Sequence, residues 1–244
     1  MRSADNPTAA LLEPFHDVDA TGVRISAHQG SRFAKAIAGD HNPIHDIDAP
    51  RFCVPGDLLF ALIAGRYGLA QRVQLTFRGM LRADTPLWFP EPRDGQFSIT
   101  DAGGREYVTA QFDNPLDITS EALRGLIETY VGCSGKTFPD LMVPLLEEHG
   151  VMFNPDRPLV VYDRMEIRLS AAPTSPPTMA LESTTLTVSQ KRGDARFGYR
   201  ILEADRPIGT CSKQMVVSGL RPYDHERMNA MVERYHQMAA LGQA

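Results

Sequence analysis

The chain has 244 residues, of which 43% are hydrophobic and 23% charged, and its formal net charge is −5. This is the composition of a globular protein that can bury a sizeable core, and the acidic balance without any block of Lys or Arg argues against nucleic acid as a partner. Residues 1–15 lack a basic start and an apolar core of signal-peptide length, and the longest apolar stretch, 58–64, is too short to span a bilayer. We therefore expect a cytoplasmic protein that does not enter a membrane.

The run FAKAIAGDHNPIH in the first fifth of the chain places an aspartate and a histidine five residues apart around an Asn-Pro pair. Gly39 lets the backbone turn sharply before Asp40, while Pro43 fixes its own φ and holds Asn42 in an extended conformation. We expect Asp40 and His45 to converge on one small pocket. A carboxylate and an imidazole held together can position a water molecule and move its proton near neutral pH.

The rest of the first half reads as one helix followed by antiparallel strands. An apolar stretch without internal Pro follows Pro55-Gly56-Asp57 and predicts a buried helix that begins near Gly56. Residues 73–84 alternate apolar and polar positions, as a strand does, and residues 96–112 are typical of a hairpin that closes at a Gly-Gly pair.

The second half repeats this order without repeating the acid/base run. Residues 113–116, DNPL, are the expected loop between a first domain, 1–115, and a second domain, 116–244. A helix over 121–133 and a more amphipathic stretch over 141–149 come first. Four strand-like segments and a final polar helix follow, over residues 162–172, 178–193, 195–205, 206–219 and 224–238. The order predicts an α+β chain with a weak internal repeat.

The acid/base run resembles the signature of the MaoC-like (R)-specific enoyl-CoA hydratases and dehydratases of the hot-dog fold. The matching positions are Phe33, Ala34, Gly39, Asp40, Asn42, Pro43, Ile44 and His45. The resemblance implies a double hot-dog, in which each half is an antiparallel sheet wrapped around a central apolar helix and only the first half carries the motif. It implies that Asp40 and His45 are the catalytic pair, that Gly39, Asn42 and Pro43 support their turn, and that the substrate is an acyl-CoA or acyl-carrier thioester. No metal or other cofactor is implied.

The sequence also departs from the family. Ala38 stands where the family usually has Ser or Thr, and the connection to the central helix is shorter. The enolate formed in such a reaction needs hydrogen-bond donors at the thioester oxygen, and a helix N-terminus can supply them. Gly56 is the expected donor. Asp57 beside it would oppose the developing charge unless it points away or is protonated, and it also suits an ordinary capping or dipole role.

Other interpretations of the same loop stay open. Asp40 and His45 can form a structural turn whose polar groups satisfy each other. Together with His41, Asp46 and Asp48 they are five potential metal ligands in nine residues, although neighbours in a loop rarely all face one ion. The three cysteines are widely spaced, which favours neither a disulfide framework nor a zinc site.

The function has alternatives as well, because a fold does not fix a function. A non-catalytic protein that binds an acyl ligand or acts as a scaffold is one, and a thioesterase is another. A double hot-dog chain can mimic the dimer of single-domain relatives, yet such chains often pair again, which would give a homodimer.

Overall fold

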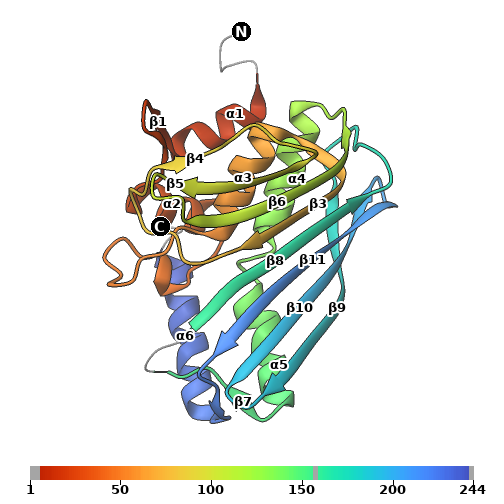
Figure 1. Cartoon of the computed structure of the whole chain (residues 1–244). Coiled ribbons are helices and arrows are strands. Elements are labelled where there is room, and N and C mark those ends of the chain that lie inside the picture. The colour runs from red at the N-terminus through yellow and green to blue at the C-terminus, as the bar shows by residue number, and fades with distance from the viewer. Residues whose placement is uncertain (1–5, 156–158, 242–244) are drawn as a thin grey trace.

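The computed structural model describes residues 6–155 and 159–241 (Figure 1). The first half contains α1 (Pro7–Leu12), η2 (Glu13–Phe15), β1 (Asp17–Asp19), β2 (Gly22–Arg24), α2 (Ala27–Ala36), η3 (Pro43–His45), α3 (Gly56–Tyr67), β3 (Leu69–Phe77), β4 (Leu87–Trp88), β5 (Gln96–Asp101) and β6 (Glu106–Leu116). The second half contains α4 (Ser120–Gly132), η4 (Thr137–Met142), α5 (Val143–Glu148), β7 (Val151–Met152), β8 (Leu159–Leu169), β9 (Thr178–Ser189), β10 (Arg192–Glu203), β11 (Arg206–Ser218), β12 (Arg221–Pro222) and α6 (His225–Leu241).

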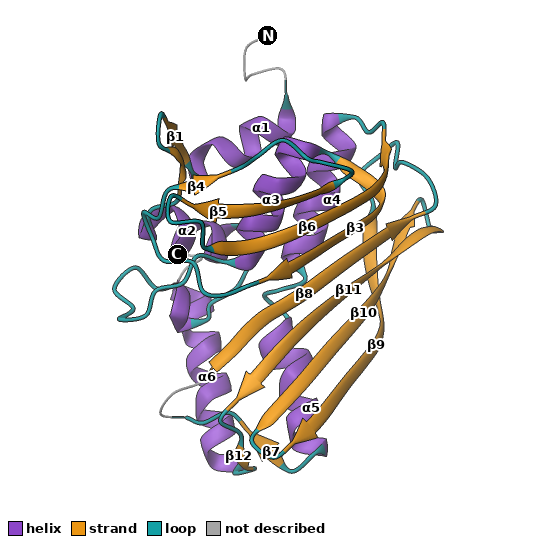
Figure 2. Ribbon diagram, viewed as in Figure 1, coloured by secondary structure: helices purple, strands orange, loops and turns teal. Residues whose placement is uncertain are grey.

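Across the described residues, ten strands form one antiparallel sheet in the order β1-β2-β4-β5-β6-β3-β8-β11-β10-β9. The halves of the chain meet inside this sheet, where β3 pairs with β8. The sheet curls, and the helices lie on its inner side (Figure 2). No helix in the described parts of the chain is both long and apolar enough to cross a membrane.

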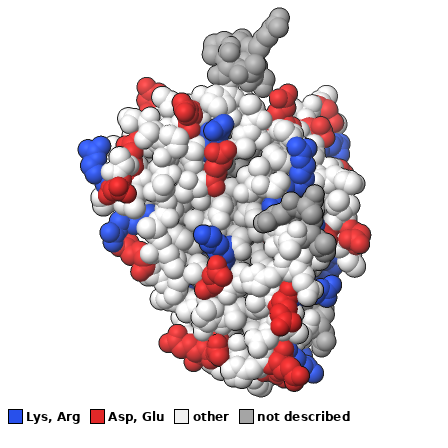
Figure 3. Space-filling model, turned by 180° about the vertical axis from the view of Figure 1, so that it is seen from behind, with Lys and Arg blue, Asp and Glu red and all other residues white. Residues whose placement is uncertain are grey.

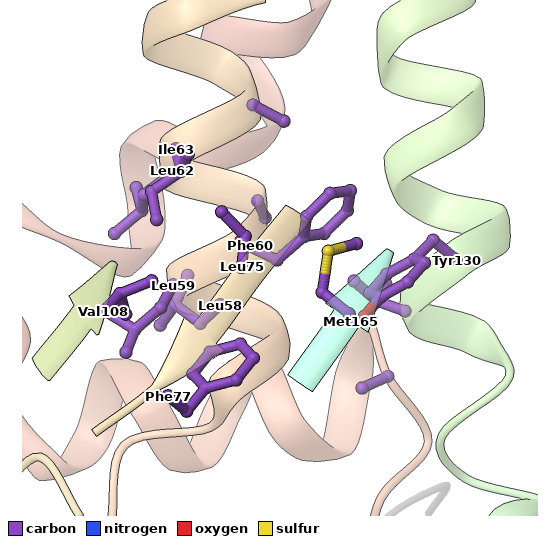
Figure 4. Packing of buried hydrophobic residues seen from close by; sticks show 14 of the residues in the cluster. Leu58, Leu59, Phe60, Leu62, Ile63, Leu75, Phe77, Val108, Tyr130 and Met165 are labelled. Carbon is purple, nitrogen blue, oxygen red and sulfur yellow. The ribbon is translucent and has the colours of Figure 1, made fainter. Parts of the chain in front are cut away.

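The helix α3 is the centre of the first half, and its composition explains why it is enclosed. Residues Asp57–Ala64 are all buried, and all but the aspartate are apolar. They pack against Leu75 and Phe77 of β3 on one side and toward α4 on the other (Figure 4). The rings of Phe60 and Tyr130 lie 4.1 Å apart between centroids, which joins α3 to α4. A helix that is apolar all round is stable only in such a position.

The helix α4 plays the same part in the second half. Thr119 caps it by accepting the N–H of Ala122 at 3.3 Å. Since α3 and α4 pack side by side, the two units share one core as well as one sheet. The predicted α+β double hot-dog architecture is therefore confirmed.

Two boundaries in the first half differ from the prediction. The strand β3 covers Leu69–Phe77, not 73–84, and Gly79 and Asp84 then have positive φ values of 158° and 58°, so the chain leaves the sheet after Phe77. Residues 113–116 are not a loop, because β6 runs to Leu116 and pairs with the start of β3. The division into domains at 115/116 stays a prediction.

The second half differs at the turns. The strand predicted over 178–193 ends early: β9 stops at Ser189, β10 begins at Arg192, and Gln190 in the tight turn between them has a φ of 54°. The β10–β11 turn lies at Ala204 and Asp205, next to the predicted division between the strands 195–205 and 206–219. Both have positive φ, 46° and 63°, which a tight hairpin between twisted strands requires.

Candidate active site

The acid/base loop follows α2, and its backbone has the predicted form. Gly39 has a φ of 64°, so the chain turns sharply before Asp40. Asn42 is extended, with φ −61° and ψ 124°, and its Oδ1 accepts the N–H of Ile44 at 3.1 Å. The N–H of Asn42 in turn donates to Oδ1 of Asp40 at 3.0 Å. These local bonds hold Asp40 and His45 on the same side of the loop.

Asp40 and His45 face each other. Oδ2 of Asp40 lies 3.6 Å from Nε2 of His45, and the side chains are 23% and 11% exposed. Nδ1 of His45 lies 2.7 Å from the carbonyl oxygen of Cys53, and since a carbonyl only accepts, this nitrogen carries the hydrogen. Nε2 is therefore the nitrogen available for proton exchange beside Asp40. Burial raises the pKa of Asp40, although His45 and the N–H of Asn42 act in the opposite direction.

A cavity of about 260 Å³ opens onto this pair. From the first half it is lined by Asp40, His45 and the first residues of α3, Gly56 and Asp57. The second half supplies much of the remaining wall, with Ser134, Thr137, Phe138, Met142, Phe153, Pro155, Val160, Val161, Tyr162, Met215, Met231, Arg234, Tyr235 and Met238. Apolar walls with a few polar groups suit a ligand that has an apolar chain and one reactive polar group.

Asp57 is not an isolated charge at the start of α3. Its Oδ1 lies 3.4 Å from Nζ of Lys213, a residue of β11 that is 0% exposed. The same Nζ donates to the carbonyl oxygen of Tyr130 at 2.8 Å and to Oγ of Ser134 at 2.9 Å, and it lies 3.9 Å from the centre of the Tyr130 ring. The ammonium thus balances the carboxylate that the sequence placed beside Gly56.

Lys213 was missed by the sequence analysis, yet the sequence contains a sign of it. Cys211, Lys213, Met215 and Val217 alternate along β11 and are all buried. A lysine in phase with inward apolar residues indicates a buried charge that needs partners.

Tyr235 of α6 was also missed, because the final helix reads as polar. This side chain is 7% exposed, and its hydroxyl meets the acid/base loop. It accepts the N–H of His41 at 3.2 Å and lies within donating distance of the carbonyl oxygens of Gly39, at 3.3 Å, and Gly135, at 3.0 Å. Tyr235 therefore ties the loop to both α6 and the segment after α4.

The five potential metal ligands of the loop do not converge. Asp46 pairs with Lys35 at 2.7 Å, and Asp48 is exposed. His41 lines the cavity, but its ring packs edge-on against Tyr235 and burial lowers its pKa. Within the described ranges, no three His, Cys, Asp or Glu side chains are grouped to hold a metal ion.

The charged surface is mixed. On the face seen in Figure 3, acidic and basic side chains are interspersed between broad uncharged areas. On the sheet, Arg72 forms ion pairs with Asp113 at 3.1 Å and with Glu166 at 3.0 Å. Of the described residues that line the cavity, Arg234 is the one arginine.

A family model described as "Protein of unknown function (DUF3581)" matches residues 10–226, which include the acid/base loop, Gly56 and Lys213. The chain belongs to the DUF3581 family. The DUF3581 match covers both halves of the double hot-dog and ends within α6. A search of curated proteins finds no match.

Several solved structures are similar to this DUF3581 chain at low identity. One is the acyl-CoA thioesterase II TesB2 from Mycobacterium marinum, with 10% identity and a TM-score of 0.42 over 89% of this chain and 98% of that one. Another is a conserved protein with a hot dog fold from Alicyclobacillus acidocaldarius, with 8% identity and a TM-score of 0.43 over 91% and 100%. A tesB protein of Mycobacterium avium subs paratuberculosis has 9% identity and a TM-score of 0.41 over 69% and 89%. These likenesses identify neither an activity nor a substrate.

Proposed function

We propose that the chain is a hydratase or dehydratase of an acyl thioester, and that its reaction is the addition of water to a trans-2-enoyl thioester to give the (R)-3-hydroxyacyl product. The observation that carries the proposal is the placement of Asp40 and His45 face to face, 3.6 Å apart, in the cavity that the N-terminus of α3 also lines. The resemblance of the loop to the MaoC-like signature supports the same reaction.

The chemistry follows from the two side chains. A water molecule held by Oδ2 of Asp40 and Nε2 of His45 attacks C3 of the enoyl chain, and Asp40 accepts a proton from it as the new C–O bond forms. The electrons of the double bond move onto the thioester oxygen as an enolate. The enolate collapses when the proton that Asp40 took from water is delivered to C2. His45, beside Asp40, helps to hold and transfer this proton. Dehydration is the same path in reverse.

The enolate oxygen needs donors, and α3 is placed to supply them. Gly56 is its first residue and lines the cavity, and the absence of a side chain lets a substrate approach its N–H. The positive end of a helix stabilises negative charge there. With Lys213 balancing Asp57, the neighbouring carboxylate does not cancel this effect.

Thioester hydrolysis is the second candidate. The Mycobacterium marinum protein carries that activity in its name, but the reason to consider it lies in this chain. A half-buried carboxylate of raised pKa and a helix N-terminus in one cavity can also direct water to a thioester carbonyl, with the thiolate as leaving group.

The test mixes the purified protein with crotonyl-CoA and with a longer trans-2-enoyl-CoA. Loss of the enoyl-thioester absorbance without released CoA reports hydration, and a thiol reagent detects the CoA that thioester hydrolysis would release. A substrate-free control is needed because the chain has three free cysteines. The variants are Asp40→Asn and His45→Ala, and Asp48→Asn is the matched control, since it removes an exposed carboxylate from the same loop.

We expect hydration by the parent and by Asp48→Asn, and a loss of at least about 10²-fold in kcat for the other two variants, the usual size of a general acid/base contribution. Release of CoA that depends on Asp40 would show that the protein is a thioesterase, and the hydratase proposal would be wrong. A folded parent that turns over neither substrate by either reaction would favour the ligand-binding or scaffold alternative.

A further inference from the structure

Ser134 stands just after α4, on the wall of the cavity that Asp40 and Gly56 also line. The residue is 6% exposed, and its Oγ lies 2.9 Å from Nζ of Lys213. The same nitrogen lies 3.4 Å from Oδ1 of Asp57, the neighbour of Gly56. The hydroxyl of Ser134 and the N-terminus of α3 are therefore held close together through one ammonium group.

The direction of the hydrogen bonds at Lys213 decides what Ser134 can do. A lysine ammonium has three hydrogens and no acceptor. Its three neighbours are Oδ1 of Asp57, the carbonyl oxygen of Tyr130 and Oγ of Ser134, so each of them accepts one hydrogen. Ser134 thus accepts from Lys213, and the hydrogen of its own hydroxyl is left for another acceptor. Within the described residues, this hydroxyl donates to no partner.

We infer that Ser134 is a second hydrogen-bond donor to the thioester oxygen of the substrate, beside the N–H of Gly56, and that Lys213 positions and polarises it. This inference rests on the proposed function and adds a catalytic residue from the second half of the chain. A hydroxyl that accepts from an ammonium donates more strongly, because each bond polarises the next. The enolate oxygen then receives two donors, and the buried positive charge of Lys213 lies behind one of them.

The first test separates the effect of the Ser134 hydroxyl from the effect of the volume of the side chain. Ser134→Ala removes the donor and Ser134→Thr keeps it, while Ser170→Ala is the matched control because Ser170 is exposed and its Oγ donates to a backbone carbonyl far from the cavity. We expect Ser134→Ala to lower kcat by about 10²-fold with a KM that changes little, which is the usual effect of losing one oxyanion donor. Ser134→Thr should recover most of this loss.

The second test detects the hydrogen bond from Ser134 to the thioester oxygen by spectroscopy, without a measurement of kcat. An enoyl thioester absorbs at longer wavelength when a donor polarises its carbonyl. Bound to the Asp40→Asn protein, whose turnover is expected to be at least about 10²-fold slower, crotonyl-CoA should show this red shift before it is consumed. The shift should be smaller in the double variant with Ser134→Ala, and it should return with Ser134→Thr. Lys213→Gln should also reduce it, even where Ser134 is unchanged.

The outcomes distinguish the inference from the function on which it rests. If Asp40→Asn abolishes turnover but Ser134→Ala changes neither kcat nor the red shift, the role of Ser134 is wrong and the proposed function stands. If Ser134→Ala and Ser134→Thr lose the same activity with the same loss of thermal stability, Ser134 is structural and the inference is overturned. If the parent turns over no thioester, both the function and this inference fall.

Discussion

At the scale of single residues, the raised pKa of Asp40 has a consequence for the pH profile. Burial raises that pKa above the ordinary value of 3.8, and the proposed mechanism needs the ionised carboxylate. We expect kcat/KM to fall as the pH is lowered through the raised pKa, and this limb to lie at higher pH than an exposed aspartate would give. A pH–rate profile measures the limb. A limb at or below the range of exposed aspartates would contradict the placement of the carboxylate.

The same shift predicts that Asp40 is held ionised at a cost in stability. Its pKa is higher in the folded than in the unfolded chain, so the folded state binds more protons between the two values. The free energy of unfolding therefore falls as the pH rises from the unfolded pKa through the folded pKa, and it stays lower at neutral pH. Asp40→Asn cannot ionise and should be more stable than the parent at about pH 7.

Urea unfolding of the parent and of Asp40→Asn, at about pH 7 and again below both pKa values, measures this difference. The gain should disappear at the acidic pH, where Asp40 is neutral in both states. An equal gain at both pH values would mean that packing, not ionisation, is responsible.

The residues of the site divide by how far their contacts reach along the sequence. Asp40, Asn42 and His45 are held by bonds within a few residues, so their arrangement was predictable from the run itself. Tyr235 lines the same cavity and Lys213 contacts two of its lining residues, Asp57 and Ser134, and both come from the distant end of the chain. A local sequence pattern cannot predict contacts between residues so far apart in the chain. The alternation along β11 nevertheless places Lys213 among the inward apolar residues, which is unusual for a lysine.

At the scale of elements, the segment after α4 presses on the acid/base loop. The N–H of Gly135 donates to the carbonyl oxygen of Ala38 at 3.0 Å, and a Cβ on Gly135 would stand 2.4 Å from the carbonyl oxygen of Gly39. Gly135→Ala should therefore displace the loop, with a loss of activity and of about 1–3 kcal/mol in stability, as overpacking usually costs. The matched control is Gly132→Ala, whose Cβ would meet nothing within 4 Å. Similar Tm and kcat values for the two variants would show that the contact does not matter.

The helix α6 is the other element that positions the loop. Tyr235→Phe removes the hydroxyl that meets the N–H of His41 and the carbonyl oxygen of Gly135, while the ring can stay packed. We expect a loss of about 1 kcal/mol in stability, the typical net value of a buried hydrogen bond, with a fall in kcat. The control is Tyr223→Phe, at a half-buried position before α6. An unchanged kcat would mean that the loop keeps its shape without α6.

Among the elements, the two central helices were predicted more accurately than the strand ends, whereas α1 and α2 were not predicted. α3 begins at Gly56, as predicted, and α4 begins at Ser120, one residue before the predicted position. The ends of β3 and β6 were wrong, because strand ends depend on which neighbour is present to pair. Pro115, a residue that suggests a loop, lies opposite Ala70 in the sheet.

At the scale of the whole molecule, the pair of Asp57 and Lys213 joins the two halves. Removing one partner of a buried ion pair leaves the other charge uncompensated, which typically costs about 3–5 kcal/mol. Lys213→Met should therefore destabilise the entire chain in one cooperative transition. The double variant Asp57→Leu with Lys213→Met should regain much of that stability. Urea unfolding measures both. A double variant no more stable than Lys213→Met would show that Lys213 acts through its other contacts.

The architecture of the whole chain was predictable because it rests on repeated order, a helix and then antiparallel strands in each half. Which strands join the two sheets, β3 and β8, and where the cavity lies between the halves were not predictable, since both depend on how the units meet. The cytoplasmic location and the homodimer stay predictions.

The position of the cavity at this junction has a consequence for stoichiometry. Two identical subunits that met in this way would form two equivalent sites, each with its own acid/base loop. Here the first half carries Asp40 and His45, and the second half carries Ser134 and Lys213. The two halves together therefore form one site and not two. Titration with a tight, unreactive thioester should therefore saturate at one ligand per chain.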